Sequence, residues 1–149
     1  MVDISQTASL GQLQNALLRE RAENAHGGRS IEFVASVDGE EAGLLSYEDW
    51  SDSGSGFIYE IFVIPSSRKM GVGACLLAYA EQYARGLGCC VLRLKPHALE
   101  SEPDSTQLVD WYMKVGYVQV ADDPSHYEKS LSVPCVAQPV AAADGFAAR

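Results

Sequence analysis

The residues best suited to bind a phosphate group are concentrated in the segment Val63–Gly73. It reads Val-Ile-Pro-Ser-Ser-Arg-Lys-Met-Gly-Val-Gly and leads from an apolar run into a segment that predicts a helix. Glycines let a backbone approach a ligand without a Cβ clash, and a helix N-terminus offers unpaired N–H groups and a positive dipole end. Arg68 and Lys69 add positive charge, in contrast to the stretch Ser30–Ser67, which has no Lys or Arg. The pattern indicates a site for a phosphate-bearing ligand.

Two common phosphate-binding loops do not match this segment. A nucleoside-triphosphate loop requires Gly-x-x-x-x-Gly-Lys-Ser/Thr, which the chain lacks. A dinucleotide fingerprint requires three glycines after the first strand of a parallel series. Here Gly71 and Gly73 have no third glycine at that spacing, and a predicted hairpin precedes them. The expected ligand therefore belongs to another class of phosphate compound.

Glu60 is a candidate for accepting a proton beside this segment. It is the one charged side chain in the otherwise apolar run Phe57–Ile64. Burial there would raise the pKa of the carboxyl and suit it to act as a general base, directly or through water. The alternative is a carboxylate at a strand position open to solvent. His97, in a predicted loop, is a second candidate for the base.

Hydrophobic periodicity and turn residues predict the elements that must position these side chains. Helices are expected at Leu10–Arg21, Ala74–Arg85 and Ser105–Val115. Strands are expected at Ile31–Val37, Ala42–Tyr47, Phe57–Ile64, Cys89–Leu94, Tyr117–Val120 and His126–Val133. The polar, glycine-rich segment Asp49–Gly56 is expected to be a loop. The order predicts a mixed α/β (α+β) fold, in which the Phe57–Ile64 and Cys89–Leu94 strands lie parallel across a right-handed helical crossover.

Length and composition indicate one globular domain. The chain has 149 residues, of which 47% are apolar and 21% charged, and this is enough for a single core. Residues 1–133 are expected to form the domain, and the alanine-rich residues 134–149 a loose tail. The formal net charge of −9 argues against nucleic acid and against a membrane surface as partners, and favours a cation or a small neutral molecule.

Cysteine usage and the N-terminal residues indicate the compartment. The four cysteines contain no Cys-x-x-Cys pair, and the three histidines show no ligand spacing, so no metal site is expected. The chain shows neither a signal-peptide pattern nor an apolar run of about 18 residues that could span a membrane. We therefore expect a cytoplasmic protein with reduced thiols.

Two motifs, in this order, resemble the GCN5-related N-acetyltransferase (GNAT) family. The first is the acetyl-CoA signature, Arg/Gln-x-x-Gly-x-Gly/Ala after a strand ending in a hydrophobic residue and Pro, which matches Val63–Gly73. The second is an aromatic-Tyr pair followed by a short basic stretch and Gly-aromatic, which matches Trp111–Tyr117. The resemblance covers roughly Ile31 to Leu131. Many members carry an Asn shortly before the second motif, where this chain has Ser105, Thr106 and Gln107.

The resemblance implies a mostly antiparallel central sheet with a parallel central strand pair and flanking helices. It also implies acetyl-CoA as co-substrate, no metal, and direct transfer of the acetyl group to an amine. Tyr112 takes the family position of the general acid, although a tyrosine at this helical spacing could instead be a core residue. Residues implied in binding coenzyme A are Phe62, Val63, Arg68, Lys69, Met70, Gly71, Val72 and Gly73.

The acceptor is expected to be a cationic primary amine, such as a polyamine, an aminoglycoside or a lysine or N-terminal amine. Seven acids lie in the stretch just ahead of the phosphate-binding segment, namely Asp38, Glu40, Glu41, Glu48, Asp49, Asp52 and Glu60, and Glu100, Glu102 and Asp104 follow it. Acids lining the acceptor site would attract an ammonium group, although they could also serve only solubility. A different acyl-CoA donor and a non-catalytic CoA-binding module are the alternatives, and a homodimer is allowed for.

Overall fold

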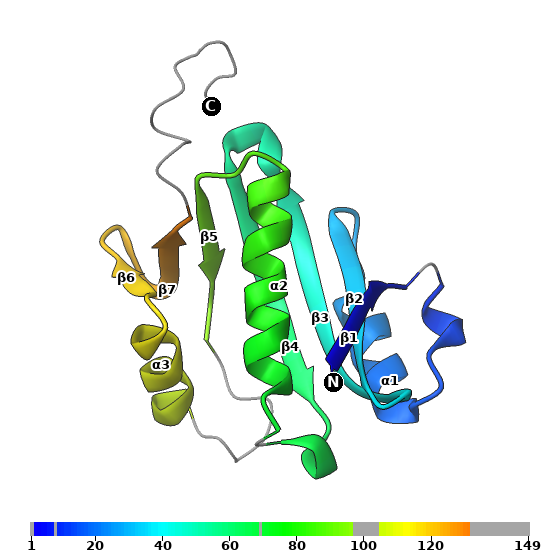
Figure 1. Ribbon diagram of the computed structural model, residues 1–149. Helices are drawn as coiled ribbons and strands as arrows, with labels where there is room; N and C mark the ends of the chain where they lie inside the picture. The colour runs from blue at the N-terminus through cyan, green and yellow to red at the C-terminus, as the bar shows by residue number, and fades with distance from the viewer. Residues whose placement is uncertain (1, 8, 69, 97–104, 132–149) are drawn as a thin grey trace.

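One mixed sheet with helices on both faces forms the domain (Figure 1). The computed structural model describes residues 2–7, 9–68, 70–96 and 105–131. The strands are β1 (Val2–Gln6), β2 (Ser30–Val37), β3 (Glu40–Trp50), β4 (Ser55–Val63), β5 (Val91–Leu94), β6 (Val118–Val120) and β7 (Asp123–Ser130). The helices are α1 (Ala16–Ala25), α2 (Val72–Gly86) and α3 (Ser105–Lys114), with single 3₁₀ turns η1 (Leu10–Gln12), η2 (Ser51–Ser53) and η3 (Pro65–Ser67).

The strand order β1-β2-β3-β4-β5-β7-β6 confirms the predicted fold class. Every neighbouring pair is antiparallel except β4 and β5, which are parallel. Helix α2 provides the crossover between these two strands. The parallel pair at the centre of the sheet is the one that the apolar runs predict.

The N-terminal region and one predicted loop differ from the expectation. Residues Val2–Gln6 form an edge strand paired with β2, where no strand was predicted. The first helix begins at Ala16 rather than Leu10, because the Asn15 side chain accepts hydrogen bonds from the Leu17 and Leu18 N–H groups at 3.0 and 3.1 Å and caps it there. The segment Asp49–Gly56 is a hairpin, since β3 continues to Trp50 and β4 starts after η2.

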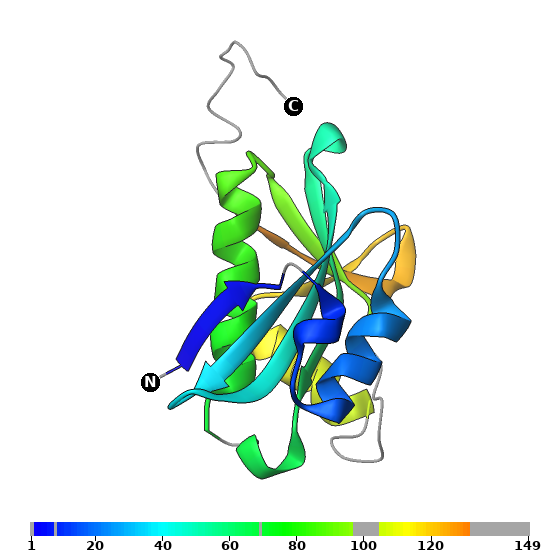
Figure 2. The same ribbon diagram turned by 90° about the vertical axis from the view of Figure 1, so that its right-hand side faces the viewer.

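Helices α1 and α2 lie on opposite faces of the sheet (Figure 2), and a core lies under each. The larger core joins the sheet to α2 and α3, and the smaller one lies beneath α1. Gly43 of β3 allows close approach of α2, because a Cβ at this position would be 3.0 Å from Val72 Cγ1 and 3.1 Å from Leu76 Cδ1. The N-terminal end of α2 is thereby fixed against the middle of the sheet.

Strands β4 and β5 pair over only part of the length of β4. Residues Ser55–Ile58 pair with Val91–Leu94, whereas β4 continues to Val63 in contact with β3 alone. Tyr59 is an extra residue in β4, since Tyr47 of β3 pairs with Ile58 and Ser46 with Glu60. A bulge of this kind bends a strand and raises its twist. The two strands therefore diverge after Ile58 and leave one edge of β4 open.

None of the helices in the described ranges is long and apolar enough to cross a membrane. Cys75 and Cys89 carry free thiols. The predicted tail, residues 134–149, lies outside the described residues, and so does His97 with the acids of its segment.

Candidate active site

A hollow of about 250 Å³ lies at the N-terminal end of α2, where the phosphate site was predicted. Three parts of the chain meet there: the end of β4, the loop that follows it, and α3. The lining residues are Val63, Ser67, Arg68, Gly71, Val72, Gly73, Ala74 and Trp111. Five of the eight residues expected to bind coenzyme A, namely Val63, Arg68, Gly71, Val72 and Gly73, thus line one hollow.

The backbone at this hollow is suited to an anion. Gly71 is in the left-handed region at φ 83° and precedes the first helical residue, Val72. The Cys75 N–H bonds to the Gly71 carbonyl at 3.0 Å, so the N–H groups before Cys75 have no acceptor within the helix. The first turn of α2 contains no acid and Gly71 provides no side-chain cap, which leaves the positive end of the dipole uncompensated by α2 itself.

Arg68 connects this loop to the sheet. Its Nε donates a hydrogen bond to the Val63 carbonyl at 2.9 Å, and its guanidinium lies 5.6 Å from the centre of the Phe62 ring. The side chain therefore holds the loop in place in addition to contributing charge. Lys69 lies outside the described residues, and Met70 is 55% exposed and is not among the residues that line the hollow.

The open edge of β4 offers backbone groups to an extended ligand. Ile64 N–H bonds to Ala42 O at 2.9 Å, and alternate residues of a strand direct their backbone groups to opposite neighbours. Phe62 therefore directs its backbone groups to β3, and Ile61 and Val63 direct theirs to the gap beside β4. An extended ligand in this gap would therefore meet the backbone of Ile61 and Val63, whereas the backbone of Phe62 faces β3.

A narrow cavity of about 30 Å³ opens at the point where β4 and β5 diverge. It is lined by Ile58, Tyr59, Glu60, Ile61, Leu94, Lys95, Pro96, Leu108 and Tyr112. Tyr112 comes from α3 on one face of the sheet, and Glu60 projects to the face covered by α1. The two predicted proton-transfer residues thus border one cavity from opposite faces of the sheet.

Glu60 is buried, with 8% of its surface exposed, and the alternative of a solvent-open position does not hold. Its Oε2 lies 3.9 Å from Arg21 Nε of α1, and the Arg21 guanidinium lies 5.0 Å from the centre of the Phe62 ring. A positive charge at this distance stabilises an ionised carboxylate in a partly desolvated place. Helix α1 thereby contributes directly to the environment of Glu60.

A row of polar side chains runs across the sheet beneath α1. Glu32, Ser46 and Glu60 are register partners on β2, β3 and β4, and all three are buried. Ser46 Oγ donates to Glu32 Oε2 at 3.0 Å, and Glu32 Oε1 lies 3.0 Å from His26 Nδ1 at the end of α1. Buried polar groups of this kind require partners, and Ser46 and His26 supply them to Glu32.

Tyr112 is 5% exposed, and burial raises the pKa of its phenol. Its ring packs against Trp111 at 4.9 Å and edge-on against Tyr117 at 5.7 Å between centroids. The raised pKa means that the hydroxyl is protonated at neutral pH, the form that can donate a proton. Core packing and proton donation are therefore compatible at this residue.

Of the seven acids from Asp38 to Glu60, only two reach the sheet face near the cavity. Glu48 and Glu60 do so, one on each of the paired strands β3 and β4. Glu41 has a structural task instead, because its Oε1 accepts from the Gln14 and Asn15 N–H groups at 2.9 and 2.7 Å before α1. Asp52 lies 3.5 Å from Arg29 in the β3–β4 hairpin.

Sequence reasoning missed three residues that surround the site: Arg21, Ile61 and Trp111. Trp111 was the aromatic partner of Tyr112 in the second motif, and its side chain lines the hollow beside Gly73. Its position one residue before Tyr112 could have indicated this. Arg21 had no local signal, since its contact with Glu60 depends on how α1 packs. Within the described ranges, no cluster of three or more His, Cys, Asp or Glu could hold a metal ion.

Comparison with known proteins reveals several similar chains. An aminoglycoside N(6')-acetyltransferase type 1 of Klebsiella aerogenes is 32% identical over 101 residues, which cover 64% of this chain and 66%, just under two thirds, of that protein. The fold is similar to that of an IAA acetyltransferase of Bacillus cereus, with a TM-score of 0.69, 18% identity, and coverage of 88% of this chain and 100% of the other. It is also similar to the PaiA N-acetyltransferase of Thermoplasma acidophilum in complex with coenzyme A, with a TM-score of 0.62, 16% identity, and coverage of 87% and 99%.

The family model described as the acetyltransferase (GNAT) family matches residues 1–123. This range includes the phosphate-binding segment, both strands that diverge, and all of α3. The chain belongs to the GNAT acetyltransferase family, as its two motifs indicated.

Proposed function

We propose that the protein is an acetyl-CoA-dependent N-acetyltransferase that moves the acetyl group directly to a cationic primary amine. The observation that carries this proposal is the shared cavity of Glu60 and Tyr112, which opens where β4 leaves β5. The anion-binding hollow lies at the far end of the same strand edge. A co-substrate with a diphosphate in the hollow and an extended arm along Ile61 and Val63 would place its thioester near the cavity.

The reaction needs two proton transfers. The amine nitrogen attacks the thioester carbonyl carbon, a C–N bond forms, and the C–S bond breaks. Glu60 accepts the proton that the ammonium group loses, directly or through water, and Tyr112 donates a proton to the departing coenzyme A thiolate. Backbone N–H groups on the open edge of β4 would stabilise the oxyanion as charge develops on the carbonyl oxygen.

The small cavity favours acetyl over a longer acyl group. Its volume is only about 30 Å³. An acyl chain of many carbon atoms would have to displace buried side chains there, at the cost typical of overpacking. We therefore propose acetyl-CoA as the donor.

The acceptor class rests on the charge of the chain and on one relative. The aligned relative is named for acetylating aminoglycosides, which are polycationic amines, and this chain carries a net charge of −9. We accordingly propose a cationic small molecule, a polyamine or an aminoglycoside, ahead of a lysine or N-terminal amine. The same proposal includes a cytoplasmic location and allows for a homodimer.

Thiol release from acetyl-CoA tests the proposed reaction. The full chain is incubated with acetyl-CoA and a panel of amines that includes spermidine, cadaverine, neamine, glucosamine and a lysine peptide. Release that depends on the amine, with the acetylated amine identified by mass, supports the proposal. Tight binding of acetyl-CoA without turnover on any amine would favour the non-catalytic CoA-binding module instead.

Substitution of Gly71→Glu is expected to weaken acetyl-CoA binding by at least about tenfold. A carboxylate at this position would repel the phosphates and compete for the N–H groups of α2. Gly88→Glu is a matched control, because Gly88 also has a positive φ, 85°, and open space around its Cα, but lies beyond the other end of α2. Calorimetric titration with coenzyme A measures both. Equal affinities for the two variants would contradict the placement of the diphosphate.

Substitution of Glu60→Gln is expected to lower kcat about tenfold or more at neutral pH, where the acceptor is an ammonium ion and needs a base. The loss should shrink as the pH rises towards the pKa of the acceptor amine, because the solvent then supplies the neutral nucleophile. Initial rates measured between roughly pH 7 and 10, the range in which amines titrate, test this pH dependence. A loss that is independent of pH would indicate a structural role alone. Glu20→Gln, an exposed position on α1, is the control.

A further inference from the structure

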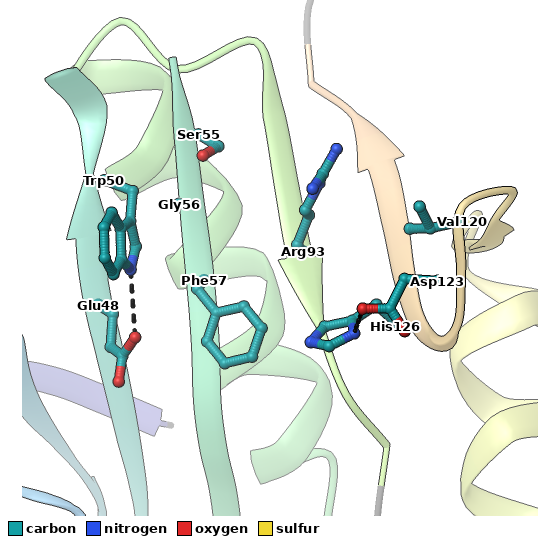
Figure 3. Close-up of a pocket in the computed structure, with 9 residues that line it drawn as sticks. All are labelled: Glu48, Trp50, Ser55, Gly56, Phe57, Arg93, Val120, Asp123 and His126. Atoms are coloured by element: carbon teal, nitrogen blue, oxygen red, sulfur yellow. Dashed lines mark hydrogen bonds and ion pairs between the residues drawn. The ribbon is translucent and has the colours of Figure 1, made fainter. Parts of the chain in front are cut away.

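A groove of about 320 Å³ on the sheet has no part in the reaction described above. It is formed where β3, β4, β5 and β7 lie side by side (Figure 3). Its lining residues are Glu48, Trp50, Ser55, Gly56, Phe57, Arg93, Val120, Asp123 and His126. The volume lies within the range of small-molecule sites. Helix α1 packs against the neighbouring part of β3 and β4. The groove therefore begins at the part of the sheet that α1 no longer covers.

The groove adjoins the proposed reaction centre on the same face of the sheet. Residues on one face of a strand are normally two apart, but the bulge at Tyr59 brings Phe57 and Glu60, three apart, to the same face. Their register partners on β3 lie on the same face, since Glu48 pairs with Phe57 and Ser46 with Glu60. A molecule whose reacting amine lies at Glu60 would extend over Phe57 into the groove.

Two carboxylates flank the Phe57 ring. Figure 3 places Glu48 on the β3 side of this ring, and Asp123 with His126 on the β7 side. Glu48 Oε1 accepts a hydrogen bond from Trp50 Nε1 at 3.1 Å, which fixes both side chains. Asp123 Oδ2 lies 2.6 Å from His126 Nδ1, and the His126 ring lies 5.8 Å from the centre of the Phe57 ring. Both acids are held by neighbouring side chains, and the Asp123 side chain remains half exposed.

The charges in and around the groove leave its carboxylates available to a cation. A hydrogen bond from the Ser125 hydroxyl is the main reason that the pKa of Asp123 is lowered, so this group is ionised at neutral pH. Of the basic side chains, His126 contacts Asp123 itself, and the two arginines are engaged with other groups. Arg93 Nε lies 2.9 Å from Glu128, and the Arg29 guanidinium stacks 3.8 Å from the centre of the Trp50 ring near Asp52.

We propose that this groove binds a second ammonium group of the acceptor, over the face of Phe57 and between the carboxylates of Glu48 and Asp123. The face of an aromatic ring attracts a cation, and Trp50 and Phe57 provide apolar surface for the carbon skeleton that joins the two amines. The acceptor class is therefore a compact diamine or polyamine, and not a monoamine. This inference rests on the proposed acetyl transfer, since the first amine is the one that reacts.

Matched acceptors and matched variants test the inference. Wild type is assayed with two pairs of amines, cadaverine against aminopentanol and neamine against glucosamine, in which the first member carries additional ammonium groups. The variants are Glu48→Gln and Asp123→Asn. The control is Glu40→Gln, which makes the same change of charge at the other end of β3, at an exposed position. Circular dichroism confirms that each variant is folded.

We expect wild type to prefer the polycation of at least one pair by about tenfold in kcat/KM. Glu48→Gln and Asp123→Asn should each raise the KM for that polycation by about fivefold, the size of a partly exposed charge-assisted contact. Their kcat, and all constants for the monoamine, should stay at the wild-type values. Equal preference within both pairs, or variants that behave like Glu40→Gln, would overturn the proposal.

The experiments distinguish a failure of the proposed acetyl transfer from a failure of the proposed cation site. If wild type acetylates no amine, the proposed function fails. Calorimetric titration with neamine then tests, by itself, whether the groove binds a cation. Binding that is weakened by Glu48→Gln and Asp123→Asn but not by Glu40→Gln would still support a cation site. Absence of neamine binding, or binding that all three variants leave unchanged, would overturn it.

Discussion

Substitution of Tyr112→Phe is expected to lower the kcat of amine acetylation by about 100-fold, with little change in the KM for either substrate. General acid catalysis contributes an effect of this size, and the phenol of Tyr112 is kept protonated by burial. The ring packing against Trp111 and Tyr117 is retained in phenylalanine. Steady-state thiol release at saturating acetyl-CoA measures the loss, which should be equal in kcat and kcat/KM.

Tyr117→Phe is the matched control for this experiment. Tyr117 is the neighbouring buried tyrosine, but its hydroxyl donates to Glu81 Oε2 at 2.9 Å, away from the cavity. Its loss should lower the free energy of unfolding by about 1–2 kcal/mol and leave kcat unchanged. A Tyr112→Phe enzyme with wild-type kcat would reduce Tyr112 to a core residue and move the proton donor elsewhere.

Substitution of Gly56→Ala is expected to lower the free energy of unfolding by about 3 kcal/mol, because the core cannot make room for the methyl group. A Cβ at this position would clash with the Tyr47 hydroxyl oxygen and lie 2.7 Å from its Cζ. Tyr47 is fully buried, with its ring edge-on against Tyr83 at 5.2 Å. Urea denaturation followed by circular dichroism measures the change.

Two further variants separate this clash from a general effect of alanine. Gly86→Ala should leave stability unchanged or raise it by up to about 1 kcal/mol, because Gly86 is helical and has open space around it. The double variant Tyr47→Phe, Gly56→Ala should recover part of the loss, since it removes the nearest oxygen. If Gly56→Ala matches wild type in stability, then Tyr47 and β4 do not pack as described.

Local signals explain how much of the fold could be predicted. Runs of apolar and β-branched residues predicted β2, β3, β4 and β5, and the parallel pair followed from the helix between the last two. Val2-Asp3-Ile4-Ser5-Gln6 alternates apolar and polar residues, but a segment of this length is a weak signal. Strand β1 was missed also because its partner β2 is distant in the sequence. The start of α1 was missed because the leucines before it outweighed the capping signal of Asn15.

The candidate site also contains residues that local sequence signals predict and residues that they do not. The phosphate hollow is built from one continuous segment, so its glycines and Arg68 could be recognised directly. Glu60 stood out because a carboxylate in an apolar strand is unusual. Arg21 beside Glu60, and Glu48 across the groove from Asp123, depend on sheet order and helix packing. No pattern in the sequence relates positions on β3 and β7, since β4 and β5 lie between these strands.

The short pairing between β4 and β5 has a thermodynamic consequence. Four residue pairs, Ser55–Ile58 with Val91–Leu94, provide the strand contact between the β1–β4 half of the sheet and the β5–β7 half. A ligand bound in the gap would contact both halves, and part of its binding free energy would stabilise the contact between them. By mass action, a ligand at 100 times its Kd adds about 2.7 kcal/mol to stability. A ligand that binds across this seam would therefore raise the stability of the whole sheet.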